Sequence, residues 1–105
     1  MEGYVTIKDP NGRVDYFQFK NGKVNGFGIQ TNATGPLYRG EYKDSSHDGY
    51  GLIKYKNNDE YDGQWKNDYR HGEGVFKEAS TERVERRLYE DDEVKEVLEV
   101  IEQGQ

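Results

Sequence analysis

The stretch that decides the fold is residues 61–76, which read YDGQWKNDYRHGEGVF. A glycine lies midway between Tyr61 and Trp65, and a pair of glycines, Gly72 and Gly74, follows after a short polar link. Large and polar residues alternate around these positions, as is typical of a β-strand, whose side chains point to opposite faces in turn. The two aromatic rings and the glycine between them are therefore expected on one face, and the polar residues on the other.

This pattern recurs along the chain every 23 residues. Glycine pairs occur at Gly26/Gly28, Gly49/Gly51 and Gly72/Gly74, and aromatic pairs occur at Tyr38/Tyr42 and Tyr61/Trp65. Each repeat has two strand-like runs around a turn cluster, so it is interpreted as a β-hairpin. Four units follow, at residues 3–19, 26–42, 49–65 and 72–88. The outer two are degenerate, as terminal repeats commonly are: Asp15 replaces the first aromatic residue of the first unit, and Val84 and Leu88 take the two aromatic positions of the last.

The glycines have a mechanical interpretation. A glycine on one face of a sheet leaves space in which an aromatic ring from a neighbouring strand can lie flat. We therefore interpret eight glycines as structural: Gly26, Gly28, Gly40, Gly49, Gly51, Gly63, Gly72 and Gly74. A phosphate-binding loop of the GxGxxG type is rejected, because it needs a third glycine and a helix directly afterwards, whereas Gly74 is followed by Val75-Phe76 in a strand pattern.

Two units carry a family pattern in full: Tyr38-Arg-Gly40-Glu-Tyr42 with Gly49-Tyr-Gly51, and Tyr61-Asp-Gly63-Gln-Trp65 with Gly72-Glu-Gly74. Over roughly residues 3–89 the chain resembles the MORN-repeat (membrane occupation and recognition nexus) family. The resemblance implies a mainly β protein, built as a single-layer twisted antiparallel sheet of four stacked hairpins with an aromatic-lined groove. It also implies a non-enzymatic scaffold role in cytoskeletal, ciliary (axonemal) or membrane-contact assemblies. Phospholipid binding has been attributed to the family, but no lipid-binding residue can be carried over.

The outer units depart from the family pattern. Phe17 stands where Gly40 and Gly63 stand in their units, and is expected to fill the groove at the first unit. Arg86, at the matching position of the last unit, is expected to end it. Eight strands about 4.8 Å apart predict a rod about 40 Å long.

After Glu90 the apolar residues change from period two to a helical spacing. Val94, Val97, Leu98 and Ile101 would form one stripe of an amphipathic helix over residues 91–103. Asp91, Asp92 and Glu93 would suit the N-terminus of that helix. The stripe is expected to pack over the last hairpin; docking on a partner or on a second copy of the chain is the alternative.

Composition limits the function. The 105 residues are only 31% hydrophobic and 34% charged, but nine Tyr, four Phe and one Trp argue against disorder. There is no cysteine, no signal peptide and no membrane span, so we expect a cytoplasmic protein. Residues 79–105 carry 4 basic and 9 acidic residues, a net of −5, which disfavours nucleic-acid binding.

No catalytic, metal or cofactor site is expected. His47 and His71 are placed in surface loops without a second ligand at metal spacing, and the carboxylates cluster at turns. A basic row of Lys20, Lys43 and Lys66 recurs at the repeat period, but acidic neighbours favour a solvated face over a lipid contact. The glycosylation sequon Asn32-Ala33-Thr34 is interpreted as an ordinary polar turn.

These observations favour an interaction module that presents an aromatic groove to a protein partner in a multi-subunit assembly, with a homodimer left open. The anchors named are Tyr38, Tyr42, Tyr55, Tyr61, Trp65 and Phe76, and internal packing is the alternative role for each. A peripheral binder of anionic phospholipid is the second hypothesis. The third is a regulatory part of an enzyme, which the initiator methionine and the absence of a linker disfavour.

Overall fold

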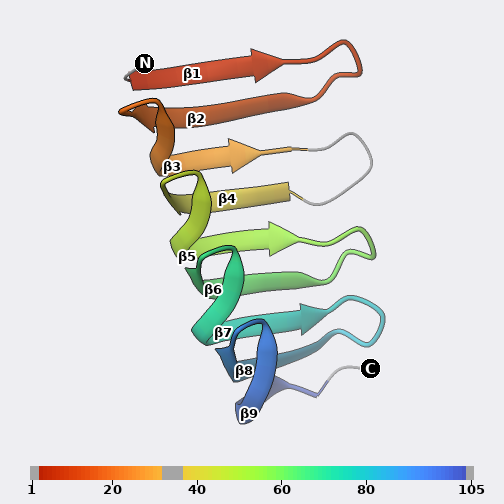
Figure 1. The fold of residues 1–105 in the computed structure, drawn as a ribbon. Coiled ribbons are helices and arrows are strands. Elements are labelled where there is room, and N and C mark those ends of the chain that lie inside the picture. The colour runs from red at the N-terminus through yellow and green to blue at the C-terminus, as the bar shows by residue number, and fades with distance from the viewer. Residues whose placement is uncertain (1–2, 32–36, 104–105) are drawn as a thin grey trace.

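A computed structural model describes residues 3–31 and 37–103 of the chain. Nine strands form one open antiparallel sheet in which each strand pairs with the next along the chain, in a single layer (Figure 1). They are β1 (Gly3–Lys8), β2 (Val14–Lys20), β3 (Lys23–Gln30), β4 (Leu37–Lys43), β5 (Ser46–Lys54), β6 (Glu60–Lys66), β7 (Tyr69–Glu78), β8 (Arg83–Glu90) and β9 (Glu93–Glu102). The predicted open single-layer sheet is confirmed, but it has nine strands and not the predicted eight of four hairpins, and its longest dimension is 45 Å.

Two-residue turns join each hairpin unit to the next. They are Asn21-Gly22, Asp44-Ser45, Asn67-Asp68 and Asp91-Asp92, and every one of these residues has a positive φ, between 47° and 76°. Two successive residues with positive φ define a type I′ turn, which matches the natural twist of paired strands. Asn, Asp and Gly tolerate this conformation best, so the chain reverses at these positions.

The turns are also bonded to one another across the repeat. The backbone N–H of the second turn residue donates to a carbonyl one repeat earlier, at 2.8–3.0 Å: Ser45 to Val24, Asp68 to His47, and Asp92 to Arg70. This ladder holds the turn and the start of the following strand over one face of the sheet. An interior thereby forms on that face of the single-layer sheet, beneath the turns.

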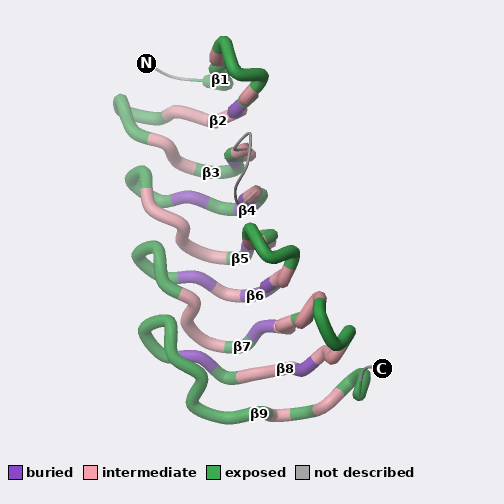
Figure 2. The backbone as a smooth tube through the Cα atoms, turned by 90° about the vertical axis from the view of Figure 1, so that its right-hand side faces the viewer, coloured by how far each residue is buried: buried purple, intermediate pink, exposed green. Residues whose placement is uncertain are grey.

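The core lies on the face that carries the glycines. Tyr38, Tyr42, Tyr61, Trp65 and Tyr89 form the buried cluster, and Phe17, Val24, Ile53, Tyr55 and Phe76 pack against it. Figure 2 shows the buried positions gathered in the middle strands, whereas β1 and β9 at the two ends are mostly exposed. Phe17 packs edge-on against Tyr42 at 5.7 Å between ring centroids, so it fills the interior at the first unit as expected.

The predicted C-terminal helix is wrong. Residues 93–102 form the ninth strand, β9, and no helix occurs in residues 3–31 or 37–103. Asp91 and Asp92, interpreted as a helix N-terminus, instead form the fourth type I′ turn, directly after Tyr89 and Glu90. Of the predicted stripe, Val94, Val97 and Ile101 are exposed, and Leu98 is half-buried.

The residue spacing of β9 explains how a strand came to look helical. The strand reads EVKEVLEVIE, a triplet of Glu, Val and a variable residue. Three irregularities in its pairing with β8 each insert one residue, so three residues of β9 span two of β8. Glu96 and Glu99 therefore face Leu88 and Arg86, all on the face opposite the core. The bulges thus place residues that are three positions apart on the same face of β9, although a period of three is close to the 3.6 of a helix.

The last hairpin is one residue longer than the others. Gly72 pairs with Tyr89, whereas Gly49 pairs with Trp65, one residue earlier in its unit. The prediction that Val84 and Leu88 take the two aromatic positions, and Arg86 the position of the central glycine, is therefore wrong. The structure gives these positions to Glu85, Tyr89 and Arg87, and the unit ends at residue 89. The sequon at residues 32–34 lies outside the described residues.

Candidate interaction surfaces

The aromatic residues predicted to line an open groove are mostly interior. Tyr38, Tyr42, Tyr61 and Trp65 are 0–7% exposed. Their rings, with Tyr89, form one continuous edge-to-face series with centroids 5.0–5.5 Å apart, running Tyr42, Tyr38, Trp65, Tyr61 and Tyr89. Such pairs stabilise beyond the area they bury. The structure thus uses these four rings as its core, which leaves no open groove at their positions.

The polar atoms of these rings are satisfied inside the protein. The hydroxyl of Tyr38 donates to the Glu41 carbonyl at 2.8 Å, and that of Tyr61 donates to the Gln64 carbonyl at 2.8 Å. Trp65 Nε1 donates to the Gly51 carbonyl at 3.0 Å. Burial raises the pKa of the Tyr38 and Tyr61 phenols above the ordinary value. These rings carry no free polar atom for a partner.

The glycines serve three different needs. A Cβ on Gly28, Gly51 or Gly74 would enter a tyrosine ring, so the predicted space for a ring is confirmed at these three glycines, which we call the ring seats. At Gly40 and Gly63 the obstacle is the neighbouring backbone. Gly26, Gly49 and Gly72 have φ between 88° and 101°, a conformation that disfavours other residues.

His47 is not in a surface loop as predicted. It lies in β5, and its imidazole stacks on the Tyr38 ring at 3.7 Å between centroids with an interplanar angle of 6°. Burial lowers the pKa of His47, and the nearby Asp68 carboxylate opposes that shift. His71 also lies in a strand, β7, where its Nδ1 accepts the backbone N–H of Asp91 at 3.4 Å. Both histidines therefore have structural contacts.

A hollow beside the core keeps two of the predicted anchors accessible. Tyr55 and Phe76 are half-buried, with ring centroids 6.5 Å apart, and line a cavity of about 520 Å³ with Arg70 and Asp92. Arg70 lies over the Tyr89 ring at 4.7 Å and donates to Asp92 Oδ1 at 2.7 Å. The Arg70 guanidinium is therefore already committed to the turn that precedes β9.

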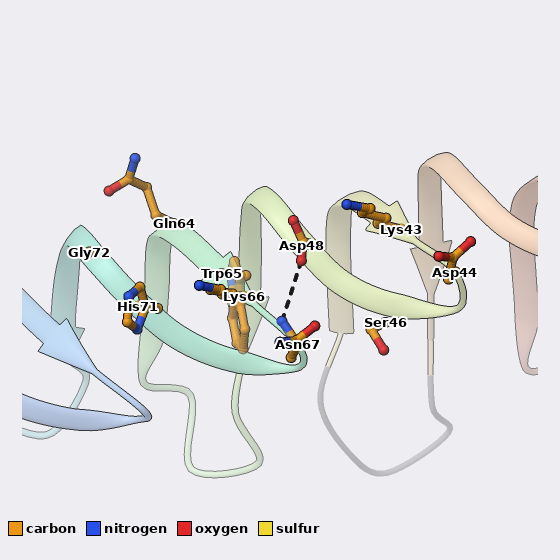
Figure 3. A pocket seen from close by; sticks show the side chains of 10 residues that line it. All are labelled: Lys43, Asp44, Ser46, Asp48, Gln64, Trp65, Lys66, Asn67, His71 and Gly72. Atoms are coloured by element: carbon orange, nitrogen blue, oxygen red, sulfur yellow. Dashed lines mark hydrogen bonds between the residues drawn. The ribbon is translucent and has the colours of Figure 1, made fainter.

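A second hollow lies between the turns that follow β4 and β6 (Figure 3). It has a volume of about 620 Å³ and holds Lys43 and Lys66 of the predicted basic row. Asp44 and Asp48 lie in the same lining, and Asp48 accepts the backbone N–H of Asn67 at 3.4 Å. The two acidic side chains match the two lysines in number, so the hollow is not a concentrated positive patch.

Carboxylates replace the first aromatic residue at both ends of the core. Asp15 is buried and bonded to Arg13 and to the Thr31 backbone N–H; burial alone would raise its pKa, but these bonds outweigh burial and lower it. Hydrogen bonds from Arg83 and Arg87 likewise lower the pKa of Glu85. Both carboxylates are held as paired anions, which suits end caps of an aromatic core rather than proton transfer.

The face opposite the core carries exposed aromatic residues that the sequence interpretation missed. Tyr4, Phe27 and Tyr50 are 60%, 40% and 62% exposed, and we call them the aromatic row. Each follows Gly3, Gly26 or Gly49 directly and recurs at the period of 23 residues. That recurrence is the sequence signal that identifies them.

The position of the row is fixed by side chains of the intervening strands. Glu41 Oε1 accepts the backbone N–H of Tyr50 at 2.8 Å, and Gln18 Oε1 accepts that of Phe27 at 3.3 Å. One strand separates each ring from the next, so the rings repeat at about 10 Å, twice the strand spacing. Tyr16 stacks on Tyr4 at 5.3 Å between ring centroids and widens the row at β1 and β2.

Comparison with known families agrees with this repeat. The family model of the MORN repeat matches residues 18–36, 38–60 and 61–77, more than half of the chain. The chain belongs to the MORN-repeat family. MORN repeats are generally protein-binding or lipid-binding modules rather than enzymes. A search of curated proteins finds no match.

Two kinds of feature are absent from the described residues. No group of three or more His, Asp or Glu side chains in residues 3–31 and 37–103 is placed to hold a metal ion. The same residues include no helix of the length and apolarity that crossing a membrane requires.

Proposed function

We propose that this MORN array is a non-enzymatic scaffold module that binds a protein partner through the aromatic row. The observation that carries the proposal is the exposure of Tyr4, Phe27 and Tyr50 at one position in three successive repeats. The exposure of this position distinguishes these rings from the buried rings on the other face, which form the core. Tyr and Phe are frequent interface anchors, because they present a large rigid area at low entropic cost.

The surroundings of the row support a protein ligand. Ile29, Leu52 and Val75 lie half-buried on the same face, one row further along the strands. Polar and charged residues, among them Arg39 and Asp62, alternate with them. Aromatic anchors with apolar neighbours and a polar surround are the usual composition of a protein interface.

The setting we propose is a larger cytoplasmic assembly of the cytoskeletal or ciliary (axonemal) kind. A partner there would bridge several repeats, because the row crosses β1, β3 and β5 and only a long contact would engage all three rings. The alternative function is binding of anionic phospholipid, and Lys43 and Lys66 in the hollow between turns are the residues that favour it.

The test compares variants matched in chemistry. Tyr50→Ser is set against Tyr69→Ser, since Tyr69 is 52% exposed but lies outside the row. Each folded variant is immobilised, and the proteins it retains from a native extract are compared by quantitative mass spectrometry. Tyr50→Ser should weaken the affinity for a retained partner by about 2 kcal/mol, roughly thirtyfold, whereas Tyr69→Ser should leave that affinity unchanged. Equal retention by both variants would contradict the proposal.

The lipid alternative is tested on the same proteins. Flotation with anionic vesicles should show little binding, and Lys43→Gln with Lys66→Gln should leave partner retention unchanged at physiological salt, because exposed charges are screened. Strong flotation that these lysine variants abolish would favour the lipid function.

A further inference from the structure

The net charge of the chain is concentrated at one end of the sheet. Residues 90–102 contain seven acidic residues and one lysine, a net of −6, which equals the formal charge of the whole protein. The remaining residues carry 14 basic and 14 acidic side chains and are neutral. The charged segment comprises Glu90 at the end of β8, the last turn, and β9, the strand at the edge of the sheet.

Four of these acidic residues form a line along β9. Glu93, Glu96, Glu99 and Glu102 face Glu90, Leu88, Arg86 and Val84 of β8 in turn, all on one face. They therefore repeat at about 6.8 Å, the distance of two residues along an antiparallel strand. We call these four side chains the glutamate line.

The glutamate line is only partly neutralised within the chain. Arg86 Nε lies 3.4 Å from Glu99, but the same guanidinium also contacts Glu73, and Lys95 lies 3.3 Å from Glu93. Across the described part of the chain, no ion pair joins Glu96 or Glu102 to a basic side chain. The line keeps an excess of negative charge in a single row.

The outer edge of β9 is also open. β9 pairs with β8 on one side, and among residues 3–31 and 37–103 no strand pairs with its other side. A strand at a sheet edge exposes a row of backbone N–H and C=O groups that an added strand can use. Val97 and Ile101 are exposed along it, so the edge offers apolar contacts beside the charge.

The charge decides which strand can be added. A second copy that paired β9 with β9 would bring two acidic segments together, and like charges that face one another oppose such self-pairing. An extended segment with Lys or Arg at every second position would instead place its charges at about 6.8 Å, in step with the glutamate line. A helix places successive residues of one face at shorter intervals and would fall out of step.

We infer that the free edge of β9 is a docking site for an extended basic segment of a partner protein, bound by strand addition and by pairing of its cations with the glutamate line. This site lies at the opposite end of the array from Tyr4, and its variants leave the aromatic row unchanged. The two proposals therefore stand or fall separately.

The probe is a synthetic peptide of about ten residues in which lysine alternates with valine. Its affinity is measured by titration calorimetry against the intact chain and two variants. Glu96→Lys with Glu102→Lys reverses two unpaired charges of the line. Glu60→Lys with Asp62→Lys makes the same change of net charge on β6 and is the matched control. The β9 variant should bind at least tenfold more weakly than the control variant.

Two further measurements separate strand addition from charge attraction. A peptide N-methylated at alternate residues cannot donate backbone hydrogen bonds along one edge and should bind at least tenfold more weakly. Hydrogen exchange should slow in β9 on binding of the unmodified peptide, and not in β1. Equal weakening by both charge variants, full binding of the N-methylated peptide, or a concentration-dependent dimer that the peptide cannot displace from β9 would each overturn the inference.

Discussion

Replacing Gly51 by alanine tests the ring seats that shape this protein. Cζ of Tyr38 lies 2.5 Å from where the new Cβ would stand, about 1 Å inside ordinary van der Waals contact, and the hydroxyl oxygen is closer still. The Tyr38 ring cannot easily move aside, because His47 stacks on it at 3.7 Å and Trp65 packs edge-on at 5.5 Å between centroids. Overpacking of this kind costs about 1–3 kcal/mol.

The displaced ring would also lose a hydrogen bond. The Tyr38 hydroxyl donates to the Glu41 carbonyl at 2.8 Å, and losing a typical bond of this kind costs about 1 kcal/mol. Gly51→Ala should therefore destabilise the protein by about 2–4 kcal/mol in urea unfolding, and lower the melting temperature by more than about 8 °C.

Two comparisons show whether the ring is the cause. Gly22→Asp should cost only about 1 kcal/mol, since a Cβ there meets nothing within 4 Å and the remaining strain is that of the positive φ of 76°, a conformation that Asp92 also adopts at the equivalent turn position. In a Tyr38→Phe background the nearest obstacle and the hydrogen bond are already absent, so the cost of Gly51→Ala should fall by about 1 kcal/mol. A Gly51→Ala protein as stable as the wild type, or a cost unaltered by Tyr38→Phe, would refute the reasoning.

Three further predictions concern the interior. Burial lowers the pKa of His47 below 6.5, so the unfolded state takes up its proton first and stability falls as the pH drops below about 6.5; melting curves of His47→Phe should therefore be flatter than those of the wild type between about pH 7.5 and 5.5. Asp15 has a lowered pKa, so its stabilisation is present at neutral pH and is lost as the pH falls from about 3.9 through the folded-state pKa; Asp15→Asn should lower the melting temperature at pH 7 and narrow its difference from wild type at pH 3. Trp65→Ala should cost about 3–5 kcal/mol in urea unfolding, as a core truncation does, and a cost under about 1 kcal/mol would show that the ring is not interior.

The repeat made most of the sheet predictable. A period of 23 residues with fixed glycine and aromatic positions located the strands from β1 to β8 and the ring seats at Gly51 and Gly74. Alternation also placed Tyr61 and Trp65 correctly on one face. It could not tell which face of a single-layer sheet is open, because that depends on how the turns fold over the rings through backbone bonds such as Asp68 to His47.

Two local features explain why the C-terminal end was predicted wrongly. One extra residue in the last hairpin moved the pairing from Leu88 to Tyr89, and no pattern at a fixed period reveals an insertion of that size. The triplet in β9 has an apolar period near that of a helix, and only pairing with β8 through bulges makes it a strand. The turn before β9 nevertheless had a sequence signal, since Tyr89-Glu90-Asp91-Asp92 repeats the pattern of Trp65-Lys66-Asn67-Asp68, an aromatic and a charged residue before a two-residue turn.

Nitration of tyrosine by tetranitromethane, read by peptide mass spectrometry with and without a native extract, tests the central claim most directly. In the free protein, Tyr4, Tyr50 and Tyr69 should react, and Tyr38 and Tyr61 should not, because only the first three are exposed. In the extract, Tyr4 and Tyr50 should become protected while Tyr69 stays reactive. Reaction of Tyr38 and Tyr61 in the free protein, followed by their protection in the extract, would contradict the account and show that the partner binds the glycine-bearing face.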